Sequence, residues 1–376
     1  MLMRRALLVL CLLLLLAAAG AGVYGNSVWT RVQQPYEGYG DSEQFVEIPP
    51  GTPMTAITQR LVDAGIVRDA LVFRVALWWT GESRNLKAGE YRFDGPLSPV
   101  DVIARLTRGD VYTRRITFPE GLTMQEMARL YESRDFGTAR DFLAAASDES
   151  LIADLDPRAA DLEGYLFPET YSLPRKTPAA RLVALMVDRF RAVFGDEQRR
   201  EAEAQGLTPR DVVTLASLIE KETGTPDERP RVAAVYRNRL GRRMPLQADP
   251  TIVYAMQKAG KYNGNIRRDD LAIASPYNTY KYPGLPPGPI ASPGKASLDA
   301  ALDPADVKYL YFVSRNDGTH VFAASLTEHN RNVRRYQVDY FRSQSGGRGQ
   351  GAGGRGRQTG GRGQGIGGRA GSGRRR

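Results

Sequence analysis

An uncharged apolar run near the amino terminus is the strongest constraint on how this chain folds. Residues 6–23 carry no charge, and as a helix they extend roughly 27 Å at about 1.5 Å per residue. That length just spans a bilayer. Arg4 and Arg5 precede the run and favour a cytoplasmic amino terminus. Everything after about residue 26 is therefore expected on the extracytoplasmic side of the membrane.

Small residues at the end of this run leave a second interpretation open. Residues 17–22 are all Ala or Gly, a composition that also suits cleavage of a signal peptide. We favour an uncleaved anchor at residues 1–26, which predicts a single-pass protein of the cell inner (cytoplasmic) membrane. Cys11, the only cysteine, lies too early in the run to be the lipidated residue of a lipoprotein.

A second constraint is an apolar helix predicted over residues 209–223. Thr208 and Pro209 suit the N-cap and the first helical position, and Asp211 follows Thr208 as in a short capping box. The apolar residues cover more than half of the helix circumference, which predicts burial on several sides. Gly224 then stops the helix, directly after the segment LASLIEKET.

This helix carries Glu220 on an apolar stripe near its end, whereas Glu222 points elsewhere. Burial disfavours the charged form of a carboxyl group and so raises its pKa. A general acid that works near neutral pH needs this property. The alternative is that Glu220 ends a core helix and pairs with Lys221, Arg229 or another basic residue.

Five further blocks accompany this helix in a fixed order. They are LEGYLFPETY (162–171), ERPRVAAVYRNRL (228–240), MPLQADPTIVYAM (244–256), SPYNTYKYPGLPPGPIASPG (275–294) and the stretch from YLYFV to EHN (309–330). Together with LASLIEKETG they resemble the YceG-like family of endolytic murein transglycosylases. The resemblance extends from about residue 43 to residue 341. A chance match would not reproduce so many blocks in one order.

The resemblance implies a reaction and a catalytic residue. Glu220 occupies the position of the family's catalytic acid. The implied reaction cleaves the β-1,4 bond between N-acetylmuramic acid and N-acetylglucosamine within glycan strands, without consuming water. The muramic C6 hydroxyl attacks its own anomeric carbon and leaves a 1,6-anhydro end. One carboxyl suffices, because it first protonates the leaving oxygen and then accepts the hydroxyl proton. An ordinary glycosidase needs a second carboxylate.

Four other residues are predicted to bind substrate, each with a plain alternative. Tyr277 and Asn278 resemble the Tyr-Asn pair that lytic transglycosylases place beside the acid, but Asn and Pro also form turns. Gln247 is a candidate for sugar binding. Asp249, which precedes Pro250, either binds substrate or initiates a turn into the next helix.

Two more acidic residues lie in the block at residues 162–171. Glu163 and Glu169 flank aromatic residues there, as acids do in many carbohydrate clefts and also at packed domain junctions. The sequence does not decide between substrate binding and packing. His329 and Asn330 either cap a helix or face the cleft, and this choice also stays open.

The sequence excludes several classes of chemistry. Its two histidines, His320 and His329, and the single Cys11 allow neither a His/Cys metal cluster nor a disulfide framework. Cys11 lies in the apolar run, so it is no catalytic nucleophile. A Walker-type loop and a GxGxxG segment between a strand and a helix are also missing. We therefore expect no metal and no cofactor.

The chain is predicted to be an α+β protein beyond its anchor. Residues 27–43 are a polar linker. Residues 44–112 are predicted as strand, two helices and strand, similar to a LysM-like βααβ glycan-binding module, although short mixed units of this kind are frequent. Trp78 and Trp79 are either sugar platforms or core residues. Residues 113–343 form the larger mixed α+β catalytic domain.

The last segment, residues 344–376, differs in composition from the rest. From residue 345 it holds eight arginines, fifteen glycines and no acid. The chain's net charge is +10, so subtracting the tail's +8 leaves about +2 for the remainder. Such a segment is expected to be disordered. Because it is exported, its predicted partners are anionic envelope polymers or lipid headgroups rather than nucleic acid, and a merely solvated tail is the alternative.

The prediction as a whole is a membrane-anchored enzyme that cuts nascent peptidoglycan strands. The resemblance implies that it works alongside the penicillin-binding synthases, ending strand growth. A noncatalytic wall-binding scaffold is one alternative, and it would tolerate Glu220→Gln. A nucleic-acid-binding protein that depends on the arginine tail is the other, and it would lose affinity steeply with salt.

Overall fold

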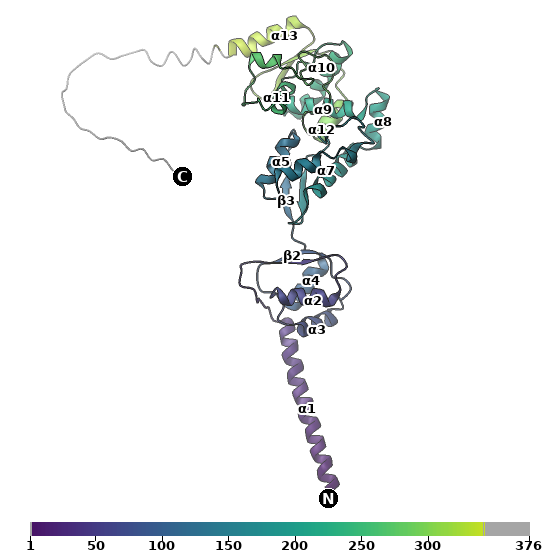
Figure 1. The fold of residues 1–376 in the computed structure, drawn as a ribbon, viewed down its shortest axis with the longest axis vertical. Coiled ribbons are helices and arrows are strands. Elements are labelled where there is room, and N and C mark those ends of the chain that lie inside the picture. The colour runs from purple at the N-terminus through teal and green to yellow at the C-terminus, as the bar shows by residue number, and fades with distance from the viewer. Residues whose placement is uncertain (1, 341, 343–376) are drawn as a thin grey trace, which may run out of the picture. The chain divides into compact units, whose positions relative to one another are not determined.

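The computed structural model describes residues 2–340 and 342 and has a mixed α+β fold, as predicted (Figure 1). By its internal contacts the chain divides into two compact units, which meet between Asp306 and Val307. The predicted catalytic domain, residues 113–343, extends over both units. The predicted tail, residues 344–376, lies outside the described residues.

The amino-terminal helix α1 (Leu2–Gln33) is longer than the apolar run. Among the described residues it is the one helix that is long and apolar enough to cross a membrane. Residues 27–33, predicted as the start of a polar linker, are helical. The reason is packing, since Val28 and Val32, one turn apart on the helix, are buried in the core of the module that follows.

This module shows the predicted order of strand, two helices and strand. Its two strands pair antiparallel, with Gln44 opposite Phe93 and Ile48 opposite Gly89. Its elements are β1 (Gln44–Ile48), α2 (Met54–Asp63), α3 (Ala70–Thr80), β2 (Gly89–Phe93) and α4 (Pro99–Arg108). Trp78 and Trp79 lie outside its core, because both side chains are largely exposed. The likeness to a LysM module and its glycan binding stay predictions.

The larger part of the first unit is mostly helical and is organised around helix α9, which contacts α8, α10, α11 and α12. A short antiparallel pair of strands, β3 and β4, adjoins the module. The elements are β3 (Arg114–Thr117), α5 (Met124–Ser133), α6 (Ala139–Ala146), η1 (Glu149–Ile152), β4 (Thr170–Leu173), α7 (Ala179–Val193), α8 (Asp196–Ala204), α9 (Pro209–Glu222), η2 (Pro226–Glu228), α10 (Arg229–Gly241), α11 (Asp249–Lys258), η3 (Arg268–Ala272) and α12 (Lys295–Leu302).

Helix α9 confirms the prediction from its sequence almost residue for residue. The Thr208 hydroxyl accepts a hydrogen bond from the Asp211 N–H, and the Asp211 carboxylate accepts one from the Thr208 N–H. Every residue from Val212 to Ile219 is buried. A capped start and burial on all sides fix the direction of the helix, and therefore the position of the two glutamates at its end.

The second unit, from Val307 on, is a small antiparallel pair with a helix. Ser325 caps that helix by accepting a hydrogen bond from the Glu328 N–H. The elements are β5 (Tyr311–Ser314), β6 (His320–Ala323), α13 (Leu326–Val333) and the π-helical turn η4 (Arg334–Asp339).

Candidate active site

Glu220 lies at a junction of three helices, with its side chain only 6% exposed. One carboxylate oxygen, Oε1, is 3.3 Å from Nη2 of Arg229, the first residue of α10. The other, Oε2, accepts a 3.0 Å hydrogen bond from the N–H of Gly294, the N-cap of α12. Both oxygens therefore have a partner, and the carboxylate is oriented by groups from two other helices.

The predicted alternative for Glu220, an ion pair with a basic residue, is present. Its partner is Arg229, whereas Lys221 donates instead to the backbone carbonyl of Gly121. The pair does not use every donor of the guanidinium. Nε of Arg229 is buried and has no hydrogen-bond partner among the described residues. A donor thus remains beside Glu220 for another polar group.

A second carboxylate, Glu120, lies at the same arginine. Its Oε2 is 3.6 Å from Nη2 of Arg229, and its side chain is 47% exposed. Burial raises the pKa of Glu120, the negative charge of Glu220 raises it further, and Arg229 acts against both. Two acidic side chains therefore share one guanidinium group. Glu120 was not among the candidate residues that the sequence singled out.

Two glycines, Gly294 and Gly121, lie where these two carboxylates approach the backbone. A Cβ on Gly294 would collide with the Glu120 carboxyl group. Gly121 has a φ of +76°, in the left-handed region that glycine favours. A Cβ at this residue would lie 3.5 Å from Cγ of Glu220. The turn before α5 thus lies against the end of α9, and its backbone conformation at Gly121 favours glycine.

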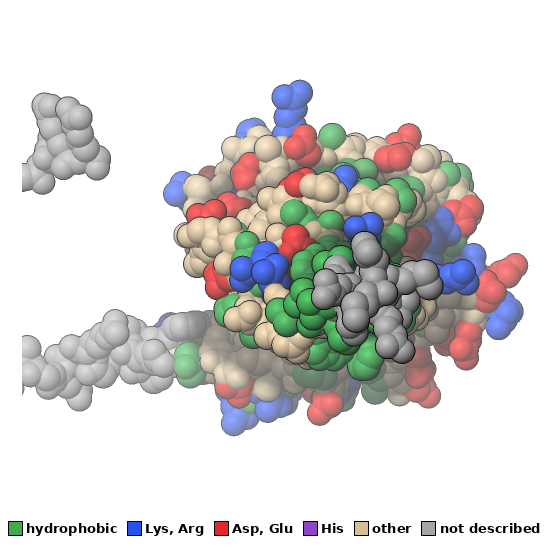
Figure 2. All heavy atoms as spheres, turned by 90° about the horizontal axis from the view of Figure 1, so that it is seen from below, with side chains coloured by type: hydrophobic (Ala, Val, Ile, Leu, Met, Phe, Trp, Pro, Cys, Tyr) green, Lys and Arg blue, Asp and Glu red, His purple; other side chains and the backbone are tan. Residues whose placement is uncertain are grey.

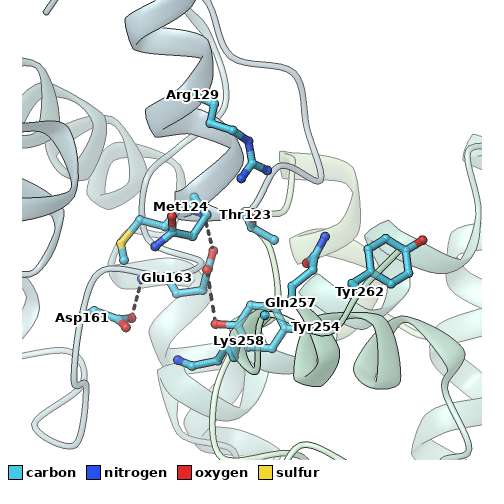
Figure 3. A pocket seen from close by; sticks show the side chains of 11 residues that line it. Thr123, Met124, Arg129, Asp161, Glu163, Tyr254, Gln257, Lys258 and Tyr262 are labelled. Carbon is cyan, nitrogen blue, oxygen red and sulfur yellow. Dashed lines mark hydrogen bonds between the residues drawn. The ribbon is translucent and has the colours of Figure 1, made fainter. Parts of the chain in front are cut away.

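A cavity of about 510 Å³ lies at the start of α5, two residues beyond Gly121 (Figure 3). Glu163 is buried at its wall, where it accepts hydrogen bonds from the Met124 N–H at 3.0 Å and the Tyr254 hydroxyl at 3.3 Å. Burial raises the pKa of Glu163 to about 8, although both hydrogen bonds oppose the shift. This carboxyl group is therefore mostly protonated at pH 7.

Charged and aromatic side chains complete the cavity. Arg129 reaches into it from α5, and Asp161 lies on the Glu163 side (Figure 3). The ring of Tyr254 lies 4.9 Å from the ring of Tyr277, and Nζ of Lys258 lies 5.5 and 5.7 Å from these two rings. The structure thus brings the predicted residues Glu163 and Tyr277 together around Tyr254, which the sequence analysis did not single out.

Tyr254 carried a weak signal in the sequence. Tyr254 and Lys258 are one turn apart on α11, so their side chains share a face of that helix. That spacing is frequent in ordinary helices, and only the tertiary structure shows that the shared face is turned toward Glu163.

Asn278 holds a turn together, which was the alternative to substrate binding. Its side-chain amide donates to the carbonyls of Leu271 and Ile273, and its oxygen accepts from the N–H groups of Tyr280 and Lys281. The residue is fully buried. All its hydrogen-bonding capacity goes to the loop, so contact with a sugar stays a prediction without support from these contacts.

Asp249 lies near the other glutamate of α9, Glu222, and Gln247 comes two residues before Asp249. Burial raises the pKa of Glu222 to about 7, and the negative charge of Asp249 adds to the shift. The Tyr236 hydroxyl donates to Glu222 at 2.8 Å, and Asp249 accepts from the Tyr280 hydroxyl. Gln247 is exposed, with a φ of +50°. Its role and that of Asp249 in substrate binding stay predictions.

The remaining candidates lie elsewhere. Glu169 is exposed and forms an ion pair with Arg189 of α7, so it does not line the cavity. In the second unit, the ring of His329 stacks on Tyr311 at 5.0 Å. His329 and Asn330 both lie inside α13, which Ser325 caps, so neither caps its start.

Comparisons with known proteins agree with the blocks found in the sequence. The model of the YceG-like family matches residues 46–335. A Bacillus subtilis (strain 168) protein named endolytic murein transglycosylase is 32% identical over 333 residues, which are 84% of this chain and 90% of that protein. A Streptococcus pneumoniae (strain R6) protein of the same name is 31% identical over 321 residues, 77% of this chain and 57% of that protein.

A solved structure is similar as well. The crystal structure of a yceG-like protein from Listeria monocytogenes aligns with a TM-score of 0.53 and 30% sequence identity. The alignment covers 78% of this chain and 99% of that one. The two proteins are therefore similar in fold over most of this chain.

Proposed function

The chain belongs to the YceG-like family and is an enzyme of the lytic transglycosylase class, and we propose that it cuts nascent peptidoglycan strands internally. The bond cleaved is the β-1,4 bond between N-acetylmuramic acid and N-acetylglucosamine, and the new end is a 1,6-anhydro sugar. The observation that carries this proposal is the carboxyl group of Glu220, which is nearly buried, pairs with Arg229 and accepts a hydrogen bond from the Gly294 N–H.

In the proposed mechanism Glu220 acts twice. As an acid it gives its proton to the glycosidic oxygen as the bond to the anomeric carbon breaks. As a carboxylate it then takes the proton of the muramic C6 hydroxyl, whose oxygen forms the new bond to that carbon. The proton count balances without water. The nucleophile is already tethered to the carbon it attacks, so much of the orientational entropy cost is removed by the substrate itself.

Arg229 and the Gly294 N–H support this cycle as positioning groups. Glu220 changes charge during each turnover, and both groups remain beside it in either state. Glu120 acts through Arg229, because it competes for the same guanidinium. Hydrolysis would require a second carboxylate that acts on water. Glu120 would be tested for this role before Glu163 and Asp249, because it lies at the same junction as Glu220.

The cavity beside Glu163 is proposed to hold a neighbouring part of the glycan strand. Gly121 faces Glu220, and Thr123, two residues later, lines the cavity. Two residues of extended chain span at most about 7 Å, which limits the distance between Gly121 and the cavity. One sugar ring is comparable in length. Tyr254 lines the cavity with its ring, and protonated Glu163 offers a hydrogen-bond donor for hydroxyl or acetamido groups.

The proposed location follows from helix α1. Arg4 and Arg5 before the apolar run support a cytoplasmic amino terminus, and the catalytic region would then lie on the extracytoplasmic side of the inner membrane, where nascent strands are made. There the protein would act beside the penicillin-binding synthases and end strand growth. We also propose that residues 344–376, which lie outside the described structure, bind anionic envelope polymers.

The first experiment weighs the products of cleavage. Full-length protein in detergent is incubated with uncrosslinked glycan strands, and the parent is compared with Glu220→Gln and with Glu222→Gln. The second variant is a matched control, because it makes the same change two residues away on α9. We expect anhydro-ended fragments from the parent and the control, and none from Glu220→Gln.

The other outcomes point to other functions. Fragments that carry an added water would mean hydrolysis. Strand binding without any products, in the parent as in the variant, would favour the scaffold. Cleavage that survives in folded Glu220→Gln would remove Glu220 from the reaction.

A further inference from the structure

All three tryptophans of the chain gather where α1 enters the module. Trp29 of α1 and Trp79 of α3 are in edge contact, with ring centroids 4.6 Å apart. Trp78 is 79% exposed, Trp79 58% and Trp29 37%. Two adjacent tryptophans on the outside of a small module need a reason, because burying such rings is strongly favourable.

The outer face of α3 is unlike that of an ordinary surface helix. Its inner face, with Val72, Phe73, Ala76 and Leu77, fills the module core. The outer face carries Leu71, Arg74 and Trp78, spaced at three and four residues, so that they form one stripe. A polar stripe is expected on the solvent side of a helix. Here the outer side is mainly apolar, with one cation.

The position of this face along α1 matches the edge of a bilayer. The apolar run ends at Val23, and Trp29 follows six residues later, about 9 Å further along the helix. The headgroup region adds roughly 5 to 8 Å on each side of the hydrocarbon core. Trp29 therefore lies just past the outer limit of the headgroup region, next to the depth where tryptophan is enriched in membrane proteins.

Helix α3 is held at that depth. Val28 and Val32, on the last turns of α1, are buried in the same core as Val72 and Phe73 of α3. The contact between Trp29 and Trp79 adds to this attachment. Figure 2, which looks along α1 toward the module, shows hydrophobic side chains concentrated where this helix is seen end-on. The last turns of α1 are thus part of the module core.

We propose that the outer face of α3, with Leu71, Trp78 and Trp79, docks into the headgroup region of the membrane that α1 spans. Trp29 extends this surface from the side of α1, and Arg74 pairs with lipid phosphate. The occupant is the lipid interface and not a sugar. The exposed tryptophans would then hold the module flat against the bilayer. This inference does not depend on the proposed catalytic function.

Tryptophan fluorescence tests the proposal directly, because every tryptophan of the protein belongs to this surface. A single-tryptophan protein, with Trp29→Phe and Trp79→Phe, keeps only Trp78. The full chain is reconstituted into vesicles of phosphatidylglycerol and phosphatidylethanolamine that contain lipids brominated near the headgroup. We expect the bromines to quench most of the Trp78 emission, and aqueous acrylamide to quench it weakly.

The matched control places the one tryptophan at another exposed aromatic position. Tyr282→Trp in a chain without the native tryptophans reports on the catalytic region, where Tyr282 is 52% exposed. It should respond to acrylamide and not to bromolipid. The proposal is overturned if Trp78 behaves like this control. It is also overturned if glycan fragments, and not bromolipids, shield Trp78 from acrylamide, because the face would then be a sugar platform.

Discussion

Two carboxyl groups lie on either side of the segment formed by residues 121–124, and they differ in what surrounds them. Glu220 has a cation and a backbone N–H as partners. Glu163 has a backbone N–H and a tyrosine hydroxyl, and burial raises its pKa to about 8. Both are nearly excluded from solvent. The difference teaches that two equally buried carboxyl groups can be held by quite different partners, so burial alone does not define the surroundings of a carboxyl group.

The largest effect is expected from removing the cation. Arg229→Met would leave Glu220 buried with only the Gly294 N–H as partner, and breaking a buried ion pair in this way costs about 3–5 kcal/mol. The thermal unfolding midpoint of the full-length protein should fall sharply, and product formation with it. Arg242→Met is the control, since Arg242 is an exposed residue at the other end of α10. Equal midpoints for the two variants would contradict the pairing.

A smaller, pH-dependent effect is expected at Glu163. Its pKa in the folded protein, about 8, lies above the ordinary value of 4.5. As the pH is raised, the unfolded chain therefore loses this proton at a lower pH than the folded protein. The group's contribution to stability is full below pH 4.5 and is lost as pH rises toward 8. At about 1.4 kcal/mol for each pKa unit, the loss amounts to a few kcal/mol.

Glu163→Gln should flatten this pH dependence. Its unfolding midpoint, measured from pH 4.5 to pH 8.5, should fall less steeply than that of the parent. Glu222 contributes a similar slope, because burial raises its pKa to about 7, so a double variant should be flatter still. Parallel curves for the parent and Glu163→Gln would show that Glu163 is already ionised in the fold.

Only part of this contrast was predictable. Helix α9 and its cap followed from local signals, because Thr208, Asp211 and the apolar spacing lie within a few residues of one another. The partners of Glu220 did not. Gly294 is 74 residues away from Glu220 in sequence. Glu120 is also distant in sequence, because helices α5 to α8 lie between it and α9. Only packing brings such segments together.

The amino-terminal region shows the same limit. Residues 27–33 are polar enough to suggest a linker, and only the buried positions of Val28 and Val32 explain why the helix continues. Asn278 is a related case, because its sequence context suits a turn and a sugar site equally. Its four backbone hydrogen bonds, visible only in the fold, account for the turn.

Glu120→Gln should sharpen the comparison with a moderate effect. The carboxylate is half exposed and 3.6 Å from Arg229, so its loss should cost little stability, under about 1 kcal/mol. The rate of strand cleavage should still change several-fold, and the pH profile of that rate should shift, because Arg229 would then pair with Glu220 alone. A pH profile identical to that of the parent would make Glu120 a bystander at this junction.

The smallest effect is expected from Glu169→Gln. This variant tests whether both glutamates of the aromatic block at residues 162–171 bind the strand. Six residues separate the two glutamates, but Glu163 is buried at the cavity, whereas Glu169 forms an exposed pair with Arg189. Exposed pairs contribute about 0–1 kcal/mol. Stability and strand cleavage should therefore stay close to those of the parent, while Glu163→Gln weakens binding of the strand. A loss of cleavage in Glu169→Gln as large as in Glu163→Gln would mean that the strand reaches beyond the cavity to α7.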